Sequence, residues 1–247
     1  MENKIISGYD TGVISENFRR VRDELERAAS TSPTGKTPTL IAATKTVPVE
    51  VINYAADHLG LTHAGENRVQ ELLEKYDSYS PKLTLHFIGT LQKNKVKYIV
   101  DKVAMIHSVD SVGLAEEISK RSLAIGKRMD ILLEVNIGRE ESKGGFIPEE
   151  VGDAFDKIAA LPGVSVRGLM TMAPKCEKNS DYLKYFEETY RISVDILTKK
   201  QHNIIEPILS MGMSDSYREA AAVGATAVRV GSALFGKRTP VAEPFPR

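Results

Sequence analysis

The sequence lacks tryptophan, holds a single cysteine and carries no excess of charge of either sign among its 247 residues. The one cysteine, Cys176, excludes an internal disulfide and a cysteine-built metal site. Lysine plus arginine and aspartate plus glutamate are equal at 33 each, so no global field attracts nucleic acid or an acidic membrane. These absences predict a reduced, cytoplasmic protein that binds neither nucleic acid nor membrane.

Long apolar runs are also missing. Residues 1–10 are polar, unlike a secretory signal, and no later stretch approaches the length of a membrane span. Hydrophobic residues make up 42% of the chain, enough for one large core, with two small domains as the alternative. The five histidines are far apart in the sequence and none has metal-ligand spacing, so we expect no metal (His58, His63, His86, His107 and His202).

Strand-like and helix-like segments alternate along the chain. An amphipathic helix is predicted over 14–29, and eight apolar strand-like segments follow it, separated by helical patterns. Strands joined by helices run parallel, which leaves an open doubly wound sheet or a closed barrel, and eight units favour closure. The predicted helices after the first cover 49–59, 69–76, 95–101, 112–124, 148–161, 181–199 and 216–223.

The predicted fold is therefore α/β: a single (β/α)8 TIM barrel with an extra N-terminal helix. No low-complexity segment or long linker divides the chain. We expect one domain over residues 1–247, in which 1–10 and 239–247 are peripheral tails.

One lysine follows an apolar run, over residues 39–44, just before a proline. The end of a buried strand is a poor place for an ammonium group, so Lys45 requires an explanation. Two interpretations are open. The side chain extends from the strand end into water, or it is a partly desolvated amine of the kind that attacks carbonyl groups as a Schiff-base lysine.

The other predicted strands also end in polar or glycine-rich residues. In a β/α barrel the carboxyl ends of the strands converge on one mouth, where the chemistry is done. The side chains expected at this mouth come from Glu66, Asn67, His86, Glu134, Asn136, Ser210 to Ser214, Arg229, Gly231 and Ser232.

The segment Ser210 to Ser214 runs directly into a predicted helix, in which Ser216 and Glu219 have the spacing of a capping box. A simple turn with an N-cap is one interpretation. The other is a phosphate site, because glycine permits a close backbone approach and hydroxyl and N–H groups donate to anions. Gly231-Ser232 after the last strand favours the phosphate site, since barrels often bind phosphate in these loops.

Strand alternation places Arg229 opposite Val228 and Val230. If its face lines the mouth, a permanent cation points into the site. The alternative is an ion pair with Glu66 or Glu134.

Other residues have structural interpretations of equal or greater weight. Asn67 and Asn136 are also typical of turns that end strands, and His86 is typical of a core histidine or a pocket wall. The loop 143–146 is either a lid or mobile surface. Lysines around one predicted helix form either an anion-binding patch or a solvated face (Lys93, Lys95, Lys97 and Lys102).

Taken in order, these motifs resemble the pyridoxal phosphate homeostasis proteins, the YggS-like or PROSC family, which is related to the alanine racemase N-terminal domain. The likeness covers nearly the whole chain, with departures at Val47 and Arg68 on the rim. The motifs that carry it are Ala43-Thr44-Lys45-Thr46, Gly65-Glu66-Asn67, His86-Phe87-Ile88-Gly89, Ser142-Lys143-Gly144-Gly145-Phe146, Gly168-Leu169-Met170, Ser210-Met211-Gly212-Met213-Ser214 and Val228-Arg229-Val230-Gly231.

The resemblance implies pyridoxal 5'-phosphate as cofactor, joined to Lys45 as a Schiff base. It implies that Arg229 faces the pyridine nitrogen, and that Ser210, Gly231 and Ser232 hold the phosphate. Asn67 and His86 would lie beside the ring. Ser214 is carried over as a phosphate ligand or as a helix cap.

A pyridine nitrogen that faces an arginine is not protonated, which makes the cofactor a weaker electron sink. Lys45 is the only obvious base, and alanine racemase takes part of its second base from a further domain that this chain is too short to contain. We therefore expect a carrier and buffer of vitamin B6 without robust turnover. Apo-enzymes are expected recipients, and the chain is expected to be a monomer or weak dimer. The alternatives are a single-domain amino-acid racemase, a cofactor-free Schiff-base aldolase and a purely structural barrel.

Overall fold

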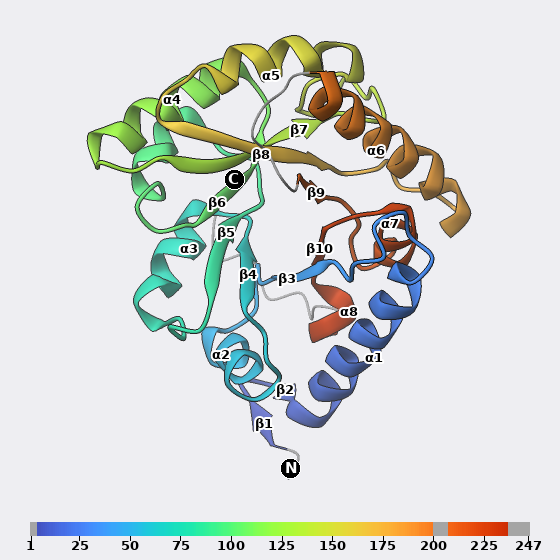
Figure 1. Ribbon diagram of the computed structural model, residues 1–247. Coiled ribbons are helices and arrows are strands. Elements are labelled where there is room, and N and C mark those ends of the chain that lie inside the picture. Colours follow the sequence, from blue (N-terminus) through green and yellow to red (C-terminus); the bar gives the residue numbers. More distant parts are fainter. Residues whose placement is uncertain (1–3, 200–206, 237–247) are drawn as a thin grey trace.

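Eight parallel strands close into a barrel in the computed structural model, which describes residues 4–199 and 207–236 (Figure 1). Each strand pairs with the next along the chain, and the last pairs with the first. The prediction of a (β/α)8 barrel with an extra N-terminal helix is confirmed. The strands are β3 (Thr39–Ala43), β4 (His63–Glu66), β5 (Thr84–Phe87), β6 (Met105–Val109), β7 (Met129–Val135), β8 (Val164–Thr171), β9 (Ile208–Ser210) and β10 (Ala227–Val230).

Helices surround the barrel and cover the outer face of its strands. The α-helices are α1 (Thr11–Ala29), α2 (Val49–His58), α3 (Val69–Lys75), α4 (Val112–Ala124), α5 (Val151–Ala159), α6 (Tyr182–Lys199), α7 (Tyr217–Val223) and α8 (Ser232–Phe235). Short 3₁₀ helices are η1 (Tyr76–Ser78), η2 (Lys93–Tyr98), η3 (Pro148–Glu150) and η4 (Asn179–Asp181). Within the described ranges, no helix is long and apolar enough to cross a membrane.

The predicted helix over 95–101 is wrong in type and position, because this crossover is the 3₁₀ helix η2. Its backbone closes through bonds to the third preceding residue, such as Lys95 N to Gln92 O at 2.9 Å. No side chain caps η2, and the chain turns into β6 within a few residues of its end. A tight 3₁₀ segment suits such a short connection.

The described part of the predicted N-terminal tail, residues 4–10, contains regular structure. Strands β1 (Ile5–Ile6) and β2 (Tyr9–Asp10) form a small antiparallel hairpin. The Asp10 carboxylate then accepts hydrogen bonds from Gly12 N and Val13 N, at 2.7 and 3.3 Å. This side chain caps α1, which explains why the helix begins at Thr11 and not at the first apolar position. The predicted tail over 239–247 lies outside the described residues.

Alternation along each strand sorts side chains between two apolar regions. Outward residues such as Val228 and Val230 join the main core between the strands and the helices. Inward residues form a smaller cluster inside the barrel, made of Met105, Leu132 and Met170 with Ile208 packed against them. Because side chains alternate at every residue, Arg229 shares the inner side of the barrel, as predicted.

Candidate functional site

Lys45 lies two residues beyond the end of β3, half-buried at the carboxyl-terminal mouth of the barrel. The backbone around it is fixed by two backbone hydrogen bonds. Thr44 N donates to Gly65 O at 3.0 Å, and Val47 N donates to Thr44 O at 3.0 Å. Between them, Thr46 adopts a φ of +63°, which is unfavourable for a β-branched residue. The turn that carries Lys45 is therefore held in a conformation that its own sequence does not favour.

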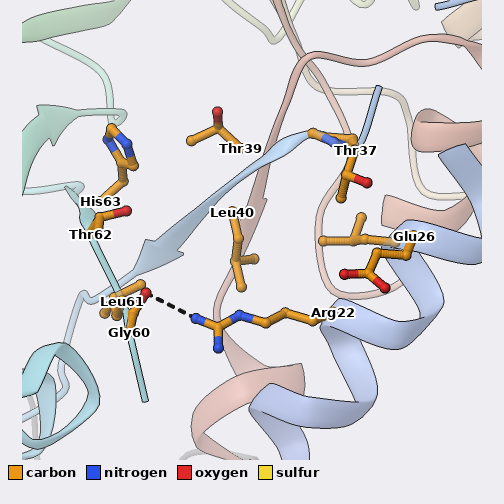
Figure 2. A pocket seen from close by; sticks show the side chains of 11 residues that line it. Arg22, Glu26, Thr37, Thr39, Leu40, Gly60, Leu61, Thr62 and His63 are labelled. Carbon is orange, nitrogen blue, oxygen red and sulfur yellow. Dashed lines mark hydrogen bonds between the residues drawn. The ribbon is translucent and has the colours of Figure 1, made fainter. Parts of the chain in front are cut away.

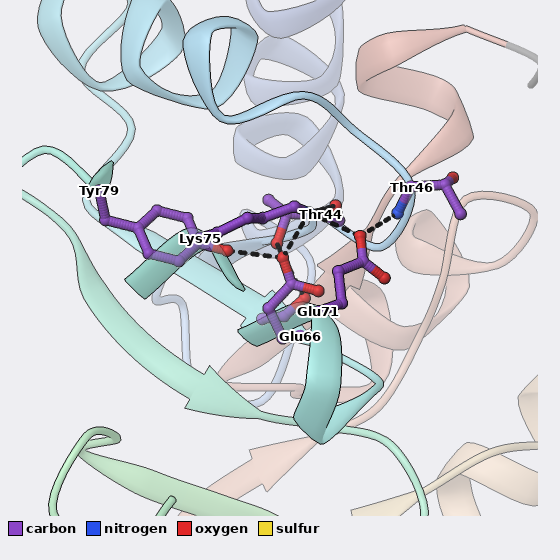
Figure 3. A network of polar contacts seen from close by, with 7 residues as sticks. Thr44, Thr46, Glu66, Glu71, Lys75 and Tyr79 are labelled. Carbon is purple, nitrogen blue, oxygen red and sulfur yellow. Dashed lines mark hydrogen bonds and ion pairs between the residues drawn. The ribbon is translucent and has the colours of Figure 1, made fainter. Parts of the chain in front are cut away.

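A polar network behind this turn supplies the restraint (Figure 3). Glu66 Oε1 accepts from Thr44 Oγ1 at 2.8 Å, Tyr79 OH at 2.6 Å and Lys75 Nζ at 3.0 Å. Lys75 Nζ also donates to Thr44 O at 3.1 Å. Thr44, which precedes Lys45, is thus bonded to Glu66 of β4 and to Lys75 of α3.

Glu71 completes the restraint from helix α3. Its Oε1 accepts from Thr46 N at 2.5 Å and from Lys75 Nζ at 2.6 Å. The bond to Thr46 N falls on the residue with positive φ, and it offsets the cost of that conformation. We conclude that this network sets the direction in which Lys45 leaves the backbone.

Burial shifts the pKa values of the groups in this network. It raises the pKa of Glu66 above its ordinary value, while the nearby ammonium group of Lys75 acts in the opposite direction. Burial and the Glu66 carboxylate together raise the pKa of Tyr79. The second carboxylate oxygen of Glu66, Oε2, is buried without a hydrogen-bond partner in the described part of the chain.

Arg229 is buried inside the barrel, 4% exposed, and held by oxygens of two neighbouring strands. Its Nη1 donates to Ser210 O at 2.8 Å and to Ser210 Oγ at 2.6 Å, and its Nη2 donates to Thr171 O at 2.9 Å. Burial lowers its pKa to about 10, so the group stays cationic at neutral pH. Among the described residues it makes no ion pair with Glu66 or Glu134, so that alternative is wrong.

His86 is a buried histidine with both ring nitrogens bonded. Its Nε2 lies 2.9 Å from His63 Nδ1, and its Nδ1 lies 3.0 Å from His107 Nε2. His107 Nδ1 in turn lies 3.0 Å from Ser210 Oγ. Burial is the main cause that lowers the pKa of His86 to about 3, so its ring is neutral at pH 7. His86 is therefore connected through His107 to the pair formed by Ser210 and Arg229.

The loop after β9 joins the loop after β10 through one hydroxyl group. Ser214 Oγ accepts from Gly231 N and from Ala233 N, each at 3.2 Å. Ser214 therefore bonds the backbone at the start of α8, and not that of α7, the helix that follows it in the sequence. The bonds also bring Ser232, the first residue of α8, next to the loop after β9.

The predicted capping box of Ser216 and Glu219 is wrong. Ser216 precedes α7 with a ψ of 8°, not with the extended backbone usual for an N-cap. Its hydroxyl is turned back and accepts from Met213 N at 3.2 Å, so no side chain caps α7. Glu219 keeps one buried carboxylate oxygen without a partner among the described residues.

Two features of the mouth are a close approach of two strands and an unused polar atom. A Cβ at Gly231 would lie 3.1 Å from Ala43 O, so only glycine lets β10 approach the end of β3 without strain. The Oδ1 atom of Asn67 is buried and has no partner within the described residues. An unused acceptor at a glycine-lined strand end fits a ligand that supplies a donor.

Asn136 has a structural role, as its turn interpretation predicted. Its Nδ2 donates to Glu140 O at 2.9 Å and its Oδ1 accepts from Glu140 N at 3.1 Å. The end of the loop 143–146 is anchored to β7, because Phe146 N donates to Glu134 O at 2.8 Å. Of the four lysines of the predicted basic patch, Lys93 and Lys97 are exposed on η2.

Glu134 is a further candidate site residue, whose burial could not be read from the sequence. It lies two residues beyond Leu132 on the inner face of β7, at the mouth. Burial raises its pKa to about 6; Asp110 adds to the rise, and Arg229 opposes it. A carboxyl group with such a pKa exchanges protons near neutral pH, which makes it a candidate acid or base.

The structure brings most of the predicted residues to one mouth. Ser210 and Arg229 are in contact, His86 reaches them through His107, and Gly231 lies against the end of the strand that leads to Lys45. His107, His63, and Lys75 and Tyr79 of the network around Thr44 and Thr46 were missed. A sequence signal existed for His107, because it is an inward position of β6 in the same pattern as His86 in β5.

Comparison with known proteins gives four consistent findings. A family model described as alanine racemase, N-terminal domain, matches residues 10–239. The pyridoxal phosphate homeostasis protein of Aquifex aeolicus is 43% identical over 225 residues, which cover 90% of this chain and 97% of that protein. Its namesake from Escherichia coli strain K12 is 34% identical over 233 residues, with coverages of 91% and 97%. PipY of Synechococcus elongatus, solved with PLP bound, is 32% identical with a TM-score of 0.77, and the match covers 90% of this chain and 100% of that one.

Proposed function

The chain belongs to the family of pyridoxal phosphate homeostasis proteins, and on that premise we propose that it binds pyridoxal 5'-phosphate and buffers its supply. All of residues 1–247 would form one cofactor-binding domain that works in the cytoplasm. The family name of the relatives and the PLP in PipY support this proposal. The observation that carries it is a half-buried lysine at the same barrel mouth as a buried, fixed arginine.

Lys45 is the proposed attachment point. The aldehyde of pyridoxal phosphate condenses reversibly with a primary amine, so one correctly directed lysine is sufficient for capture and release. The network around Thr44, Thr46 and Glu66 supports this role, because it fixes the backbone from which Lys45 extends. We propose that the same rigidity keeps the amine available between rounds of loading and delivery.

Arg229 is proposed to face the pyridine nitrogen. Its bonds to Ser210 and Thr171 fix its position, and it stays charged at neutral pH. A fixed cation there disfavours protonation of the ring and weakens the cofactor as an electron sink. This supports a carrier without robust turnover over an enzyme.

The remaining site residues are proposed as the cradle of the cofactor. Ser210, Gly231 and Ser232 would hold the phosphate, supported by the hydroxyl groups and by the close approach that Gly231 allows. Asn67 and His86 would lie beside the ring, and the unpartnered Oδ1 of Asn67 supports its place there. Apo-enzymes that need the cofactor are the proposed recipients, and the chain is proposed to act as a monomer or weak dimer.

One observation favours a second candidate, a single-domain amino-acid racemase. Glu134 places a carboxyl group with a pKa of about 6 at the mouth, and a racemase needs a second proton acceptor besides its lysine. We rank this function second, because the relatives that match nearly the whole chain are named pyridoxal phosphate homeostasis proteins.

The proposal is tested by loading the protein with pyridoxal phosphate, reducing it with borohydride and mapping the peptides. We expect the added mass on the peptide that contains Lys45, and its loss in Lys45→Ala. Lys36→Ala, on the exposed loop before β3, is the matched control and should keep the label. A label distributed over surface lysines would contradict the proposal.

Turnover is tested separately by incubating the loaded protein with amino acids in deuterium oxide. We expect very slow entry of deuterium at the α-carbon. Entry at a rate comparable to ordinary enzymes, abolished by both Lys45→Ala and Glu134→Gln, would establish the racemase in place of the carrier.

A further inference from the structure

Three histidines cross the inside of the barrel in one unbroken chain of hydrogen bonds. They come from consecutive strands: His63 from β4, His86 from β5 and His107 from β6. The two links between them measure 2.9 and 3.0 Å, and a third link of 3.0 Å joins His107 to Ser210 Oγ on β9. The ring centroids of His63 and His86 are 5.2 Å apart, and those of His86 and His107 are 5.1 Å apart.

The two ends of this chain lie at opposite mouths of the barrel. Ser210 ends β9 at the carboxyl-terminal mouth, beside Arg229. His63 begins β4 and lines a cavity of about 310 Å³ at the amino-terminal mouth, together with Thr39 and Thr62 (Figure 2). His107 and His86 are 0% and 7% exposed, whereas His63 is only half-buried. The chain thus connects the proposed ligand site to an opening on the far side.

Arg229 gives the chain a direction. A guanidinium group can only donate, so Ser210 Oγ must accept the bond from Arg229. The hydroxyl proton of Ser210 is then available for His107 Nδ1, its other partner among the described residues. When Ser210 donates to His107 Nδ1, His107 carries its proton on Nε2 and donates it to His86, and His86 does the same toward His63. In a neutral chain, all three rings therefore share the Nε2–H tautomer.

A ligand bound at Ser210 changes which group donates in the hydrogen bond between Ser210 and His107. An oxyanion that accepts the Ser210 hydroxyl proton removes the donor from His107 Nδ1, and the bond survives only if His107 becomes the donor. The same demand passes to His86 and then to His63, since each ring has only one proton. All three rings then hold the Nδ1–H tautomer, and His63 Nε2 at the far cavity changes from donor to acceptor.

From this geometry we propose that His63, His86 and His107 form a proton relay between Ser210 and the cavity at the amino-terminal mouth. The inference rests on the proposed function, because it takes a phosphate monoester as the ligand at Ser210. His107 and His63 then belong to the site as positioning residues that act through Ser210.

The relay step balances as follows. A phosphate monoester bound as its monoanion gives its proton to Ser210 Oγ, and Ser210 passes its own proton to His107 Nδ1. The Nε2 proton of His107 moves to His86 Nδ1, and that of His86 moves to His63 Nδ1. The Nε2 proton of His63 leaves to water in the far cavity. The ligand ends as the dianion, a form accessible because the second pKa of such phosphates is about 6, and every imidazole ends neutral.

Neutral rings suit this step. Burial lowers the pKa of His86 to about 3 and holds that of His107 well below its ordinary value, with the Arg229 cation adding to the effect on His107. A relay of neutral rings stores no charge inside the barrel, where a charge would be costly.

The first experiment records long-range proton–nitrogen NMR spectra of the full chain labelled with ¹⁵N-histidine at pH 7.5. Without cofactor we expect His63, His86 and His107 all as Nε2–H, and with pyridoxal phosphate all as Nδ1–H. Mixed tautomers, or a change at His107 alone while the visible spectrum shows the cofactor bound, would overturn the relay.

A second measurement follows proton release with an indicator dye in weak buffer after mixing with pyridoxal phosphate. His63→Gln keeps a hydrogen-bonding side chain at the open end but cannot carry the proton, so we expect slower release and loss of its solvent deuterium isotope effect. His58→Gln is the control, since His58 is exposed on α2 and outside the relay. Equal kinetics for both variants and the parent would refute the relay even if the cofactor binds.

Failure of the proposed function can be distinguished from failure of the relay. If no visible band appears, the cofactor proposal fails and the relay is judged on the cofactor-free protein, by comparison with Ser210→Ala. Removing the Ser210 hydroxyl group must then abolish the common Nε2–H tautomer of His107, His86 and His63. An unchanged tautomer pattern in Ser210→Ala would overturn the relay independently of any ligand.

Discussion

The ammonium nitrogen of Lys75 lies 3.0 Å from a carboxylate oxygen of Glu66, and the two side chains are only 14% and 1% exposed. The same nitrogen lies 2.6 Å from Glu71, so one half-buried cation compensates two carboxylates. These residues reach the backbone on either side of Lys45 through Thr44 and Thr46. The positive charge of Lys75 thus contributes both to the stability of the fold and to the position of the backbone that carries Lys45.

Lys75→Met tests this dependence. It leaves two buried carboxylates without their cation, so the free energy of unfolding at pH 7 should fall by about 3–5 kcal/mol. Denaturant unfolding followed by circular dichroism measures the change. Lys82→Met, which breaks the exposed pair with Asp57, is the control and should change little. Equal losses in the two variants would contradict the account, and Glu66→Gln combined with Lys75→Met should recover part of the loss.

Thr46→Asn tests the strain at the turn. Thr46 has a φ of +63°, a conformation that asparagine accepts more readily than a β-branched residue. We expect the free energy of unfolding to rise by about 1 kcal/mol, while the bond from residue 46 N to Glu71 is kept. Thr62→Asn, at an exposed position without positive φ, should give no increase. A gain at both positions would show that the effect is not due to the backbone.

Glu134 predicts a particular dependence of stability on pH. Its pKa is raised from 4.5 to about 6 in the folded protein, so the folded state binds the proton more tightly than the unfolded state does. This contribution is complete below pH 4.5 and is lost as the pH rises through 6. Glu134→Gln should therefore gain up to about 2 kcal/mol relative to the parent between pH 4.5 and pH 7.

The measurement is denaturant unfolding of parent and variant across that range. Glu116→Gln, at an exposed position of α4, should track the parent at every pH. A constant offset between Glu134→Gln and the parent would show that the carboxyl group of Glu134 does not titrate in this window.

His86 has the opposite effect. Its pKa is lowered from 6.5 to about 3, so between these values the unfolded state binds more protons and acid destabilises the fold. At pH 5 the loss from this group is about 2 kcal/mol relative to pH 7. His86→Gln should remove that part of the acid sensitivity while keeping one hydrogen-bond donor and one acceptor at the tip of the side chain. His58→Gln should leave the slope unchanged, and an equally steep slope in His86→Gln would contradict the assignment.

The barrel and the inward direction of Arg229 could be predicted because both are local properties of the sequence. Eight apolar segments separated by helical patterns favour closure, and a period of two fixes the face of each side chain. Even where the type of a crossover was wrong, as at η2, the number of strands was unaffected.

The partners of these residues could not be predicted in the same way. The bond between His107 and Ser210 joins positions 103 residues apart, and the register of the four strands from β6 to β9 decides it. The capping box at Ser216 failed for a related reason, since its backbone is not extended and its hydroxyl turns to Met213. Residue spacing gives candidates, but the conformation around each candidate selects the bonds that form.

The closed barrel also affects how readily this protein would aggregate at high concentration. Every barrel strand is paired on both sides, and in the described chain the only strand edges left open belong to β1 and β2, which are two residues each. Such short edges offer almost no template for a strand from another molecule. The proposed buffering role would require the protein in amounts that match its cargo, and an architecture with such short open edges permits such amounts with little risk of edge-to-edge aggregation.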